Sequence, residues 1–243
     1  MQSAEQNAKR RAGQAATRED GRASRWLYEL IRLFARLAIP LIARLRTEGL
    51  ANVPKTGPVI LAMNHLHWAD IPMASVRVPR VTHFMAKIEL FSVPVLGGVM
   101  RRSGAFPVRR GEGDREALRT AERLLAEGEA VVVFPEGHRS DTGALIAAHP
   151  GAGYIAIRTG APVVPVSISG TRQVFKGLRY GPFAPRVTIR DGKPFYVGGG
   201  DGRRSREELT AATEEIMRHI AEQLPPEQRG PYAEVVARAG TEE

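Results

Sequence analysis

The amino-acid sequence predicts a single α/β domain with a central, mostly parallel mixed sheet flanked by helices, preceded by an amphipathic helical segment. The sheet is predicted from short apolar runs that recur along the middle of the chain and have the pattern of buried strands. Segments with helical periodicity lie between them, and this alternation is typical of parallel strands covered by helices. The runs that we predict to be strands are 58–63, 81–86, 105–108, 130–134 and 163–168.

Capping and turn residues predict further elements of the domain. A helix is predicted over 114–129 and should end at Gly128, because glycine is common just beyond a helix terminus. Ser205 and Glu208 have the spacing of a capping box, which predicts that a last helix begins there and closes the domain. An Asp-Gly pair within 186–197 separates two strand-like runs and predicts a β-hairpin.

The N-terminal part of the chain is basic and amphipathic. Residues 1–22 are polar and are expected to form a disordered basic tail. Residues 23–47 are expected to form amphipathic helices that lie at a membrane interface, because no apolar run in them is long enough to cross a bilayer. Pro40 is expected to divide this segment into two helices. The alternative is a helix that packs on its own domain. The apolar stripe consists of Trp26, Leu30, Leu33, Phe34 and Leu37, and the arginines expected at lipid headgroups are Arg25, Arg32 and Arg36.

The composition limits the kinds of chemistry and partner. The chain has 243 residues, no cysteine and a formal net charge of +9. The lack of cysteine excludes disulfides, thiolate metal sites and a thiol nucleophile. A second basic zone lies between Arg77 and Arg110, so the positive charge is not confined to the N-terminal segment. Nucleic acid, an anionic membrane and phosphorylated metabolites are the partners that such charge would suit.

The stretch NHLHWAD, residues 64–70, follows a predicted strand and allows three interpretations. His65, His67 and Asp70 have the spacing of ligands in metal-dependent hydrolases, but no second tight cluster of ligands accompanies them. Asp70 could instead be the N-cap of a following helix. The third interpretation is proton transfer, in which a carboxylate orients a histidine base. The chain has no Gly-x-Ser-x-Gly elbow, so the substrate's own hydroxyl would attack, as in direct acyl transfer.

Two further loops follow predicted strands and carry anion-binding residue types. Residues 134–140 offer a carboxylate, a glycine and an arginine, and Arg109 with Arg110 follow the run at 105–108. Arginine pairs with phosphate through two parallel hydrogen bonds, and glycine lets backbone N–H groups approach an anion. Because the carboxyl ends of parallel strands meet at one edge of the sheet, we expect these loops to share one cleft.

These motifs together resemble those of the glycerolipid acyltransferases, the family typified by 1-acyl-sn-glycerol-3-phosphate acyltransferases. The order and spacing of four blocks fit over about residues 45–200, and the first and third blocks are the specific ones. One departure is visible, because His138 stands where the family usually has threonine. The blocks are Asn-His-x-x-x-x-Asp at 64–70, Gly-x-Phe-x-x-x-Arg at 104–110, Phe-Pro-Glu-Gly-x-Arg-Ser at 134–140 and Val-Pro-Val at 164–166.

The resemblance implies roles for individual residues. His65 is expected to be the general base that deprotonates the acceptor hydroxyl, with Asp70 polarising it. His67 is not expected to be catalytic. Residues 90–100 are expected either to line an acyl-chain groove or to belong to the core. The residues expected to bind the acceptor phosphate are Arg110, Glu136, Gly137 and Arg139.

The resemblance also implies the organisation and partners of the protein. An acyltransferase domain is expected over 48–224 and a C-terminal tail over 225–243. The expected reaction moves an acyl chain from acyl-CoA or acyl carrier protein to 1-acyl-sn-glycerol-3-phosphate, with no cofactor, metal or nucleic acid, at an anionic surface on the cytoplasmic face of the cell membrane. The alternatives are another lysolipid acceptor, including one with an amino-acid headgroup, a metal-dependent hydrolase, and a non-catalytic lipid- or nucleic-acid-binding protein.

Overall fold

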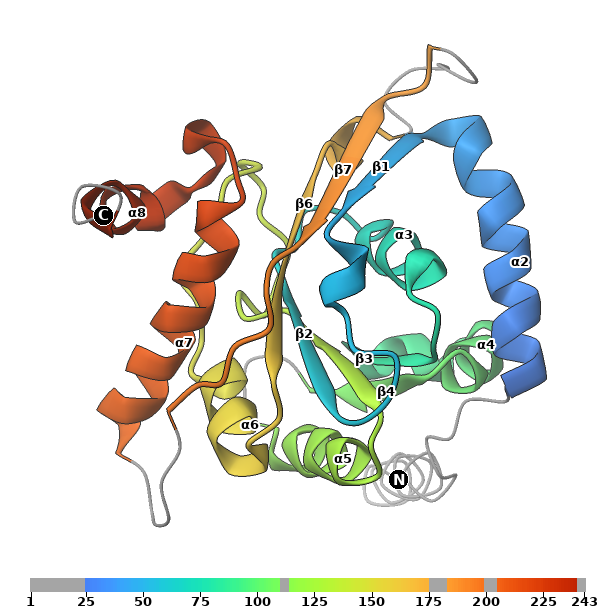
Figure 1. Ribbon diagram of the computed structural model, residues 1–243. Helices are drawn as coiled ribbons and strands as arrows, with labels where there is room; N and C mark the ends of the chain where they lie inside the picture. Colours follow the sequence, from blue (N-terminus) through green and yellow to red (C-terminus); the bar gives the residue numbers. More distant parts are fainter. Residues whose placement is uncertain (1–24, 110–113, 175–182, 199–204, 240–243) are drawn as a thin grey trace, which may run out of the picture.

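The computed structural model describes residues 25–109, 114–174, 183–198 and 205–239. Within these ranges, seven strands form one sheet in the order β1-β7-β6-β2-β5-β3-β4 (Figure 1). Strands β6 and β7 are antiparallel, and every other neighbouring pair is parallel, so the sheet is mixed and mostly parallel. The strands are β1 (Arg44–Glu48), β2 (Val59–Met63), β3 (Thr82–Lys87), β4 (Ala105–Val108), β5 (Ala130–Val133), β6 (Val163–Ser169) and β7 (Arg186–Asp191).

Helices cover both faces of the sheet and create two apolar cores. Helices α2 (Arg25–Ile42), α3 (Asp70–Arg77) and α4 (Leu96–Arg102) lie on one side of the sheet (Figure 1). Helices α5 (Arg115–Ala126), α6 (Gly151–Thr159) and α7 (Arg206–Glu222) lie on the other, and α8 (Ala233–Ala239) packs against α7. Alternate residues of β2 enter the two cores, as the period of a strand requires. The short 3-10 helices are η1 (Leu50–Asn52), η2 (Ile88–Ser92), η3 (Thr171–Gln173), η5 (Pro226–Gln228) and η6 (Gly230–Tyr232).

The predicted fold class and most of the predicted elements are confirmed. All five apolar runs are strands, with bounds that differ from the prediction by a residue at most. Helix α5 ends just before Gly128, which has φ 82°. The capping box of α7 is present, because Ser205 accepts from the backbone of Glu208 and the Glu208 side chain accepts from the backbone of Ser205. Local capping chemistry therefore determines these helix ends as expected.

The boundary of the N-terminal helices was predicted wrongly. One helix, α2, runs through Pro40, and the following residues form the edge strand β1 rather than a second helix. Pro40 stands in the last turn of α2, where the loss of one backbone hydrogen bond and the ring's clash affect little of the helix. In β1, Arg44 and Arg46 are exposed and Leu45 packs against the core. Over so few residues this pattern fits a helix as well as a strand, so the sequence did not distinguish them.

The predicted hairpin within 186–197 does not form. Both edges of β7 are already occupied, by β6 on one side and β1 on the other, so no edge is left for a hairpin partner. After Asp191 the chain instead crosses to the start of β6, where Phe195 and Val163 exchange backbone hydrogen bonds of 2.8 and 3.0 Å. The Asp-Gly pair marks a turn, but tertiary pairing decides where the chain goes next.

The two ends of the chain differ in what the structure describes. The predicted disordered tail, residues 1–22, lies outside the described residues. The predicted C-terminal tail is not a tail over its described part, because Tyr232 is buried and its hydroxyl accepts a hydrogen bond of 3.2 Å from the backbone N–H of Ala148. The segment therefore packs on the domain.

Candidate active site

Two loops meet at the carboxyl ends of adjacent parallel strands. Residues 64–70 follow β2, and residues 134–140 follow its neighbour β5. The first loop is anchored to β6 through Asn64, whose side chain accepts from the backbone of Ile168 at 2.7 Å and donates back to it at 3.0 Å. The predicted convergence of these two motifs in one cleft is therefore realised, at the sheet edge where α/β folds bind ligands.

The His65 ring is oriented by a buried carboxylate. Its Nδ1 atom lies 2.8 Å from Oδ2 of Asp70, which is fully buried. The same oxygen accepts the backbone N–H groups of Leu66 at 2.7 Å and His67 at 2.8 Å, so the carboxylate also shapes the loop. This bond places the ring proton on Nδ1 and leaves the Nε2 lone pair available, and Nε2 has no hydrogen-bond partner within the described part of the chain.

The backbone of His65 is held by the second loop. Its N–H donates to Oε1 of Glu136 at 2.8 Å, and its carbonyl oxygen accepts from the backbone N–H of Ser140 at 2.8 Å. The imidazole also stacks on Phe134, with 4.1 Å between ring centroids and 26° between the ring planes. Residues 134–140 therefore position His65 through both its main chain and its ring.

Helix α3 carries Asp70 and is fixed at both ends. Asp70 is the first residue of the helix, and its side chain accepts hydrogen bonds from the backbone of the preceding loop. The interpretation of Asp70 as the N-cap of this helix is therefore wrong. At the other end, Arg77 forms a buried bidentate ion pair with Asp191 of β7. The carbonyl of Val76 accepts from the Nε atoms of Arg32 and Arg36 at 3.2 and 3.3 Å. These cations complement the negative end of the helix dipole.

His67 has a different environment from His65. It is half-buried, and its Nδ1 accepts from the backbone N–H of Ala69 at 3.4 Å. Burial lowers the pKa of His67, although the nearby Asp70 charge opposes this shift. Among the residues with described positions, no three histidine, aspartate or glutamate side chains gather into a group that could hold a metal ion. The ring of His67 thus accepts a hydrogen bond from within its own loop.

Glu136 lies beneath the cleft and not at its surface. Its side chain is fully buried, and its two oxygens accept from the backbone N–H groups of His65 at 2.8 Å and Ile146 at 3.0 Å. Burial raises the pKa of Glu136 to about 7, and both hydrogen bonds counteract the rise. Glu136 therefore positions the backbone of the two loops instead of facing the cleft, where we had expected it to bind the acceptor phosphate. The sequence motif could not predict this, because it does not give the direction of a side chain.

Of the other predicted phosphate residues, Arg139 and Gly137 are described, and Arg139 lines the same pocket as His65. Gly137, His138 and Arg139 are exposed. Gly137 has φ 71°, and a Cβ atom there would lie 2.9 Å from the His149 ring, so glycine is required. Arg110 lies outside the described residues.

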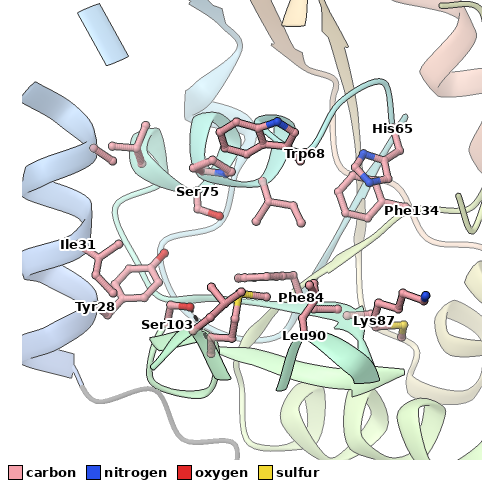
Figure 2. A pocket seen from close by; sticks show the side chains of 18 of the residues that line it. Tyr28, Ile31, His65, Trp68, Ser75, Phe84, Lys87, Leu90, Ser103 and Phe134 are labelled. Atoms are coloured by element: carbon pink, nitrogen blue, oxygen red, sulfur yellow. Dashed lines mark hydrogen bonds between the residues drawn. The ribbon is translucent and has the colours of Figure 1, made fainter. Parts of the chain in front are cut away.

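A mostly apolar pocket of about 520 Å³ extends from His65 to α2. Figure 2 shows His65 and Phe134 on one side of this space and Tyr28 and Ile31 of α2 on the other. Trp68 and Ser75 border it from above in this view, and Phe84 and Leu90 from below. The sequence indicated residues 90–100 as a possible wall, and Leu90, Leu96 and Met100 do line the pocket. The sequence did not indicate Tyr28 as a pocket residue, because a helix packed on its own domain was only the alternative interpretation of this segment.

Helix α2 turns its apolar stripe away from the protein. The five predicted stripe residues are between 54% and 72% exposed. Among the predicted headgroup arginines, the Arg32 side chain is only 10% exposed because it contacts α3, and Arg36 is exposed although its Nε also donates to Val76. The expected place of Arg32 at lipid headgroups is therefore wrong, while the exposed apolar stripe agrees with an interfacial helix. No described helix is long and apolar enough to cross a membrane.

The chain is similar in sequence to known acyltransferases. The family model described as acyltransferase matches residues 44–169. The 1-acyl-sn-glycerol-3-phosphate acyltransferase of Bacillus subtilis is 30% identical over 172 residues, covering 70% of this chain and 83% of that protein. The lyso-ornithine lipid O-acyltransferase of Pseudomonas aeruginosa is 32% identical over 140 residues, covering 57% of this chain and 52% of that protein.

A solved structure is also similar. The 1-acyl-sn-glycerophosphate (LPA) acyltransferase of Thermotoga maritima has a TM-score of 0.61 and 32% sequence identity, covering 78% of this chain and 76% of that chain. The chain spans a smaller part, 41% and 43%, of the length of two chloroplastic acyltransferases that it also matches.

Proposed function

This chain belongs to the acyltransferase family, and we propose that it transfers a fatty acyl chain from a thioester donor to the free hydroxyl of 1-acyl-sn-glycerol-3-phosphate, giving phosphatidic acid. The observation that carries this proposal is the position of His65. Its proton-accepting nitrogen is left free by Asp70, and the residue lines an apolar pocket together with Arg139. A base, a lipid-sized cavity and a cation for phosphate thus meet at one place.

The proposed reaction is direct transfer. The Nε2 atom of His65 takes the proton of the acceptor hydroxyl while that oxygen attacks the thioester carbonyl. The tetrahedral intermediate collapses to the new ester, the carbon–sulfur bond breaks, and the leaving thiolate takes the proton from the His65 imidazolium, which regenerates the base. Asp70 stabilises the imidazolium that forms and keeps the ring in the productive tautomer. No residue becomes acylated, which suits a cysteine-free chain without a serine elbow.

The acceptor phosphate is proposed to bind at the surface of residues 134–140. Arg139 is exposed beside His65, and its guanidinium can form two parallel hydrogen bonds to a phosphate. Gly137 keeps the backbone of this loop open, and Arg110 is proposed as a second cation from the loop after β4. The apolar pocket between His65 and α2 is proposed to hold an acyl chain, since its lining is chiefly aliphatic and aromatic.

The substrates are proposed to reach the site at a membrane. The exposed apolar stripe of α2 supports peripheral attachment to a bilayer. We propose that this bilayer is anionic, that the contact is on the cytoplasmic face, and that acyl-CoA or acyl carrier protein is the donor. A second acceptor class is favoured by one observation, the similarity to a protein named lyso-ornithine lipid O-acyltransferase. An amino-acid headgroup carries a carboxylate, and Arg139 could pair with it as it would with phosphate.

A panel assay tests the proposed function. The purified full chain is incubated with acyl-CoA or acyl carrier protein as donor, and with 1-acyl-sn-glycerol-3-phosphate or lyso-ornithine lipid as acceptor. Mass spectrometry identifies the product, and a His65→Ala variant serves as the control. We expect phosphatidic acid from the full chain only. Diacylated ornithine lipid alone would support the second acceptor, and no acylated product with any pair would refute the proposal.

A further inference from the structure

In addition to the apolar stripe of α2, a second exposed apolar surface lies beside the pocket. It comprises residues 90–99 between β3 and β4, and we call it the apolar turn. Four consecutive residues, Val93 to Leu96, are all exposed, including a valine that is 84% exposed. Exposed runs of this kind are unusual in a soluble domain unless they have a function. The exposed large apolar side chains are Leu90, Val93, Val95, Leu96 and Val99.

The backbone at the tip of the apolar turn is strained. Val95 has φ 65° and ψ −54°, and the N–H of Leu96 donates to the carbonyl of Pro94 at 2.7 Å, which closes a γ-turn of the positive-φ kind. Val95 is the sole residue other than glycine with positive φ in the described ranges. A β-branched side chain is especially unfavourable in this conformation. Strain of this kind persists where the surroundings enforce it, and it is concentrated at functional positions.

The surroundings of the turn do enforce its shape. Gly97 is buried against η2, and a Cβ atom there would lie 2.2 Å from the carbonyl oxygen of Phe91. The N–H of Gly97 donates to the carbonyl of Val93 at 2.9 Å, and that of Val99 donates to Val95 at 3.0 Å. The apolar side chains are therefore held outward by an ordered scaffold and are not exposed for lack of structure.

The apolar turn is continuous with the pocket and close to α2. Leu90 and Leu96 are partly exposed and also line the pocket. Helix α4, which begins within the turn, contacts α2, and the two helices lie side by side in Figure 1. The exposed cation Arg102 follows the turn, whereas Lys87 before it is paired with Glu89 at 3.4 Å. Exposed apolar side chains beside a cation such as Arg102 suit the interface of an anionic bilayer.

We propose that the apolar turn is a second membrane contact, which enters an anionic bilayer together with α2 so that the pocket opens between two inserted elements. This rests on the proposed function, because only a lipid substrate requires the pocket to face the bilayer. An acyl chain could then move between bilayer and pocket without crossing water.

The absence of cysteine permits a direct test. Three full-length variants, Val95→Cys, Phe34→Cys and Val235→Cys, are labelled with a polarity-sensitive fluorophore and mixed with vesicles of phosphatidylglycerol and phosphatidylcholine. Val235 is 47% exposed on α8, on the other side of the sheet, and is the matched control. We expect the emission of the labels at 95 and 34 to shift to shorter wavelength and the label at 235 to be unaffected.

The other outcomes separate the two proposals. A shift at 34 without a shift at 95 would refute the second contact and leave the α2 contact standing. No shift at either position would refute the second contact and also the membrane part of the proposed function, while acyl transfer to a monomeric acceptor tests the chemistry independently. A shift at 95 that depends on protein concentration and needs no vesicles would identify a second copy as the occupant and refute the proposal.

A charged substitution measures the contribution of the turn. Val95→Asp should weaken vesicle binding about tenfold, because it removes an aliphatic side chain that the bilayer would bury and adds repulsion by the anionic lipid. Aspartate tolerates positive φ better than valine, so the substitution should not destabilise the fold. Activity on a monomeric short-chain acceptor should be unchanged, and Val235→Asp should bind vesicles like the unmodified chain. Unchanged vesicle binding of Val95→Asp would refute the proposal.

Discussion

The two ends of the pocket are built in opposite ways. At the His65 end, polar groups are buried, and the imidazole and both backbone groups of His65 are hydrogen-bonded within the chain. At the α2 end, apolar side chains such as Phe34 are exposed, while Arg32 faces the protein. Buried polar groups need internal partners, whereas an exposed apolar surface needs a partner outside the chain. One end is thus complete in itself, and the other leaves an apolar surface for an outside partner, which we propose is a membrane.

The largest expected effect is at the His65 end. His65→Ala should lower turnover on the order of 10²–10⁴-fold, because it removes the proposed general base. His67→Ala should be far milder, since that ring shapes the loop and has no proposed part in proton transfer. Steady-state kinetics with one acceptor and one donor compare the two. Equal loss in both variants, together with metal bound to the unmodified protein, would favour a metal-dependent hydrolase.

The next effect concerns acceptor binding. Arg139→Ala should raise the KM for a phosphorylated acceptor roughly 10–100-fold, the range for a lost hydrogen bond to a charged group. The turnover number should change little, because the phosphate charge is present in the ground state and the transition state alike. Arg110→Ala should act in the same direction. An unchanged KM in both variants would show that the phosphate binds elsewhere.

A smaller effect is expected along the pocket wall. Ser75 lines the pocket, and its Oγ accepts a hydrogen bond of 3.0 Å from Thr82. Ser75→Phe should shift the preference among acyl donors toward shorter chains, on the order of tenfold, because the ring would occupy space needed by the chain. Competition between donors of different length measures this preference, with Ser75→Ala as the control. A general loss of activity without a change of preference would argue that this wall does not contact the acyl chain.

The smallest effect is on stability and concerns Glu136. Burial raises its pKa to about 7 from an ordinary 4.5, so the folded state binds a proton that the unfolded state has lost between these values. Its contribution to the free energy of unfolding should therefore be greatest below pH 4.5 and decline as the pH rises to about 7. Glu136→Gln should lack this decline, which thermal unfolding at pH 5 and pH 8 would show as a changed difference of a few degrees. Parallel pH dependence in the two proteins would contradict the raised pKa.

The sequence predicted the His65 end far better than the α2 end, for a physical reason. Strand runs and caps are local patterns, and the motifs fall at strand ends, so His65, Asp70 and residues 134–140 were expected to converge. The direction of Glu136 was not predictable, because the same residue type can face a cleft or a neighbouring backbone. Only the folded contact with Ile146 decides between them.

At the α2 end, periodicity predicted an amphipathic helix but not which neighbours its polar face would have. The pattern did not indicate that Arg32 and Arg36 donate to the end of α3, since that contact joins segments far apart in the sequence. The extent of the helix was also missed, because Arg44 to Arg46 fit a helix and a strand equally well over so short a stretch. The pocket between α2 and His65 is likewise a product of tertiary packing.

One measurement tests most directly whether the two ends do separate work. His65→Ala and Phe34→Asp are each assayed on a monomeric short-chain acceptor and on the same headgroup embedded in a bilayer. Phe34 is 72% exposed, so the substitution should leave the fold intact. We expect His65→Ala to lose activity on both acceptors to the same extent, and Phe34→Asp to lose activity on the bilayer acceptor alone. Equal losses on both acceptors in Phe34→Asp, or a loss in His65→Ala that is confined to one acceptor, would contradict the division.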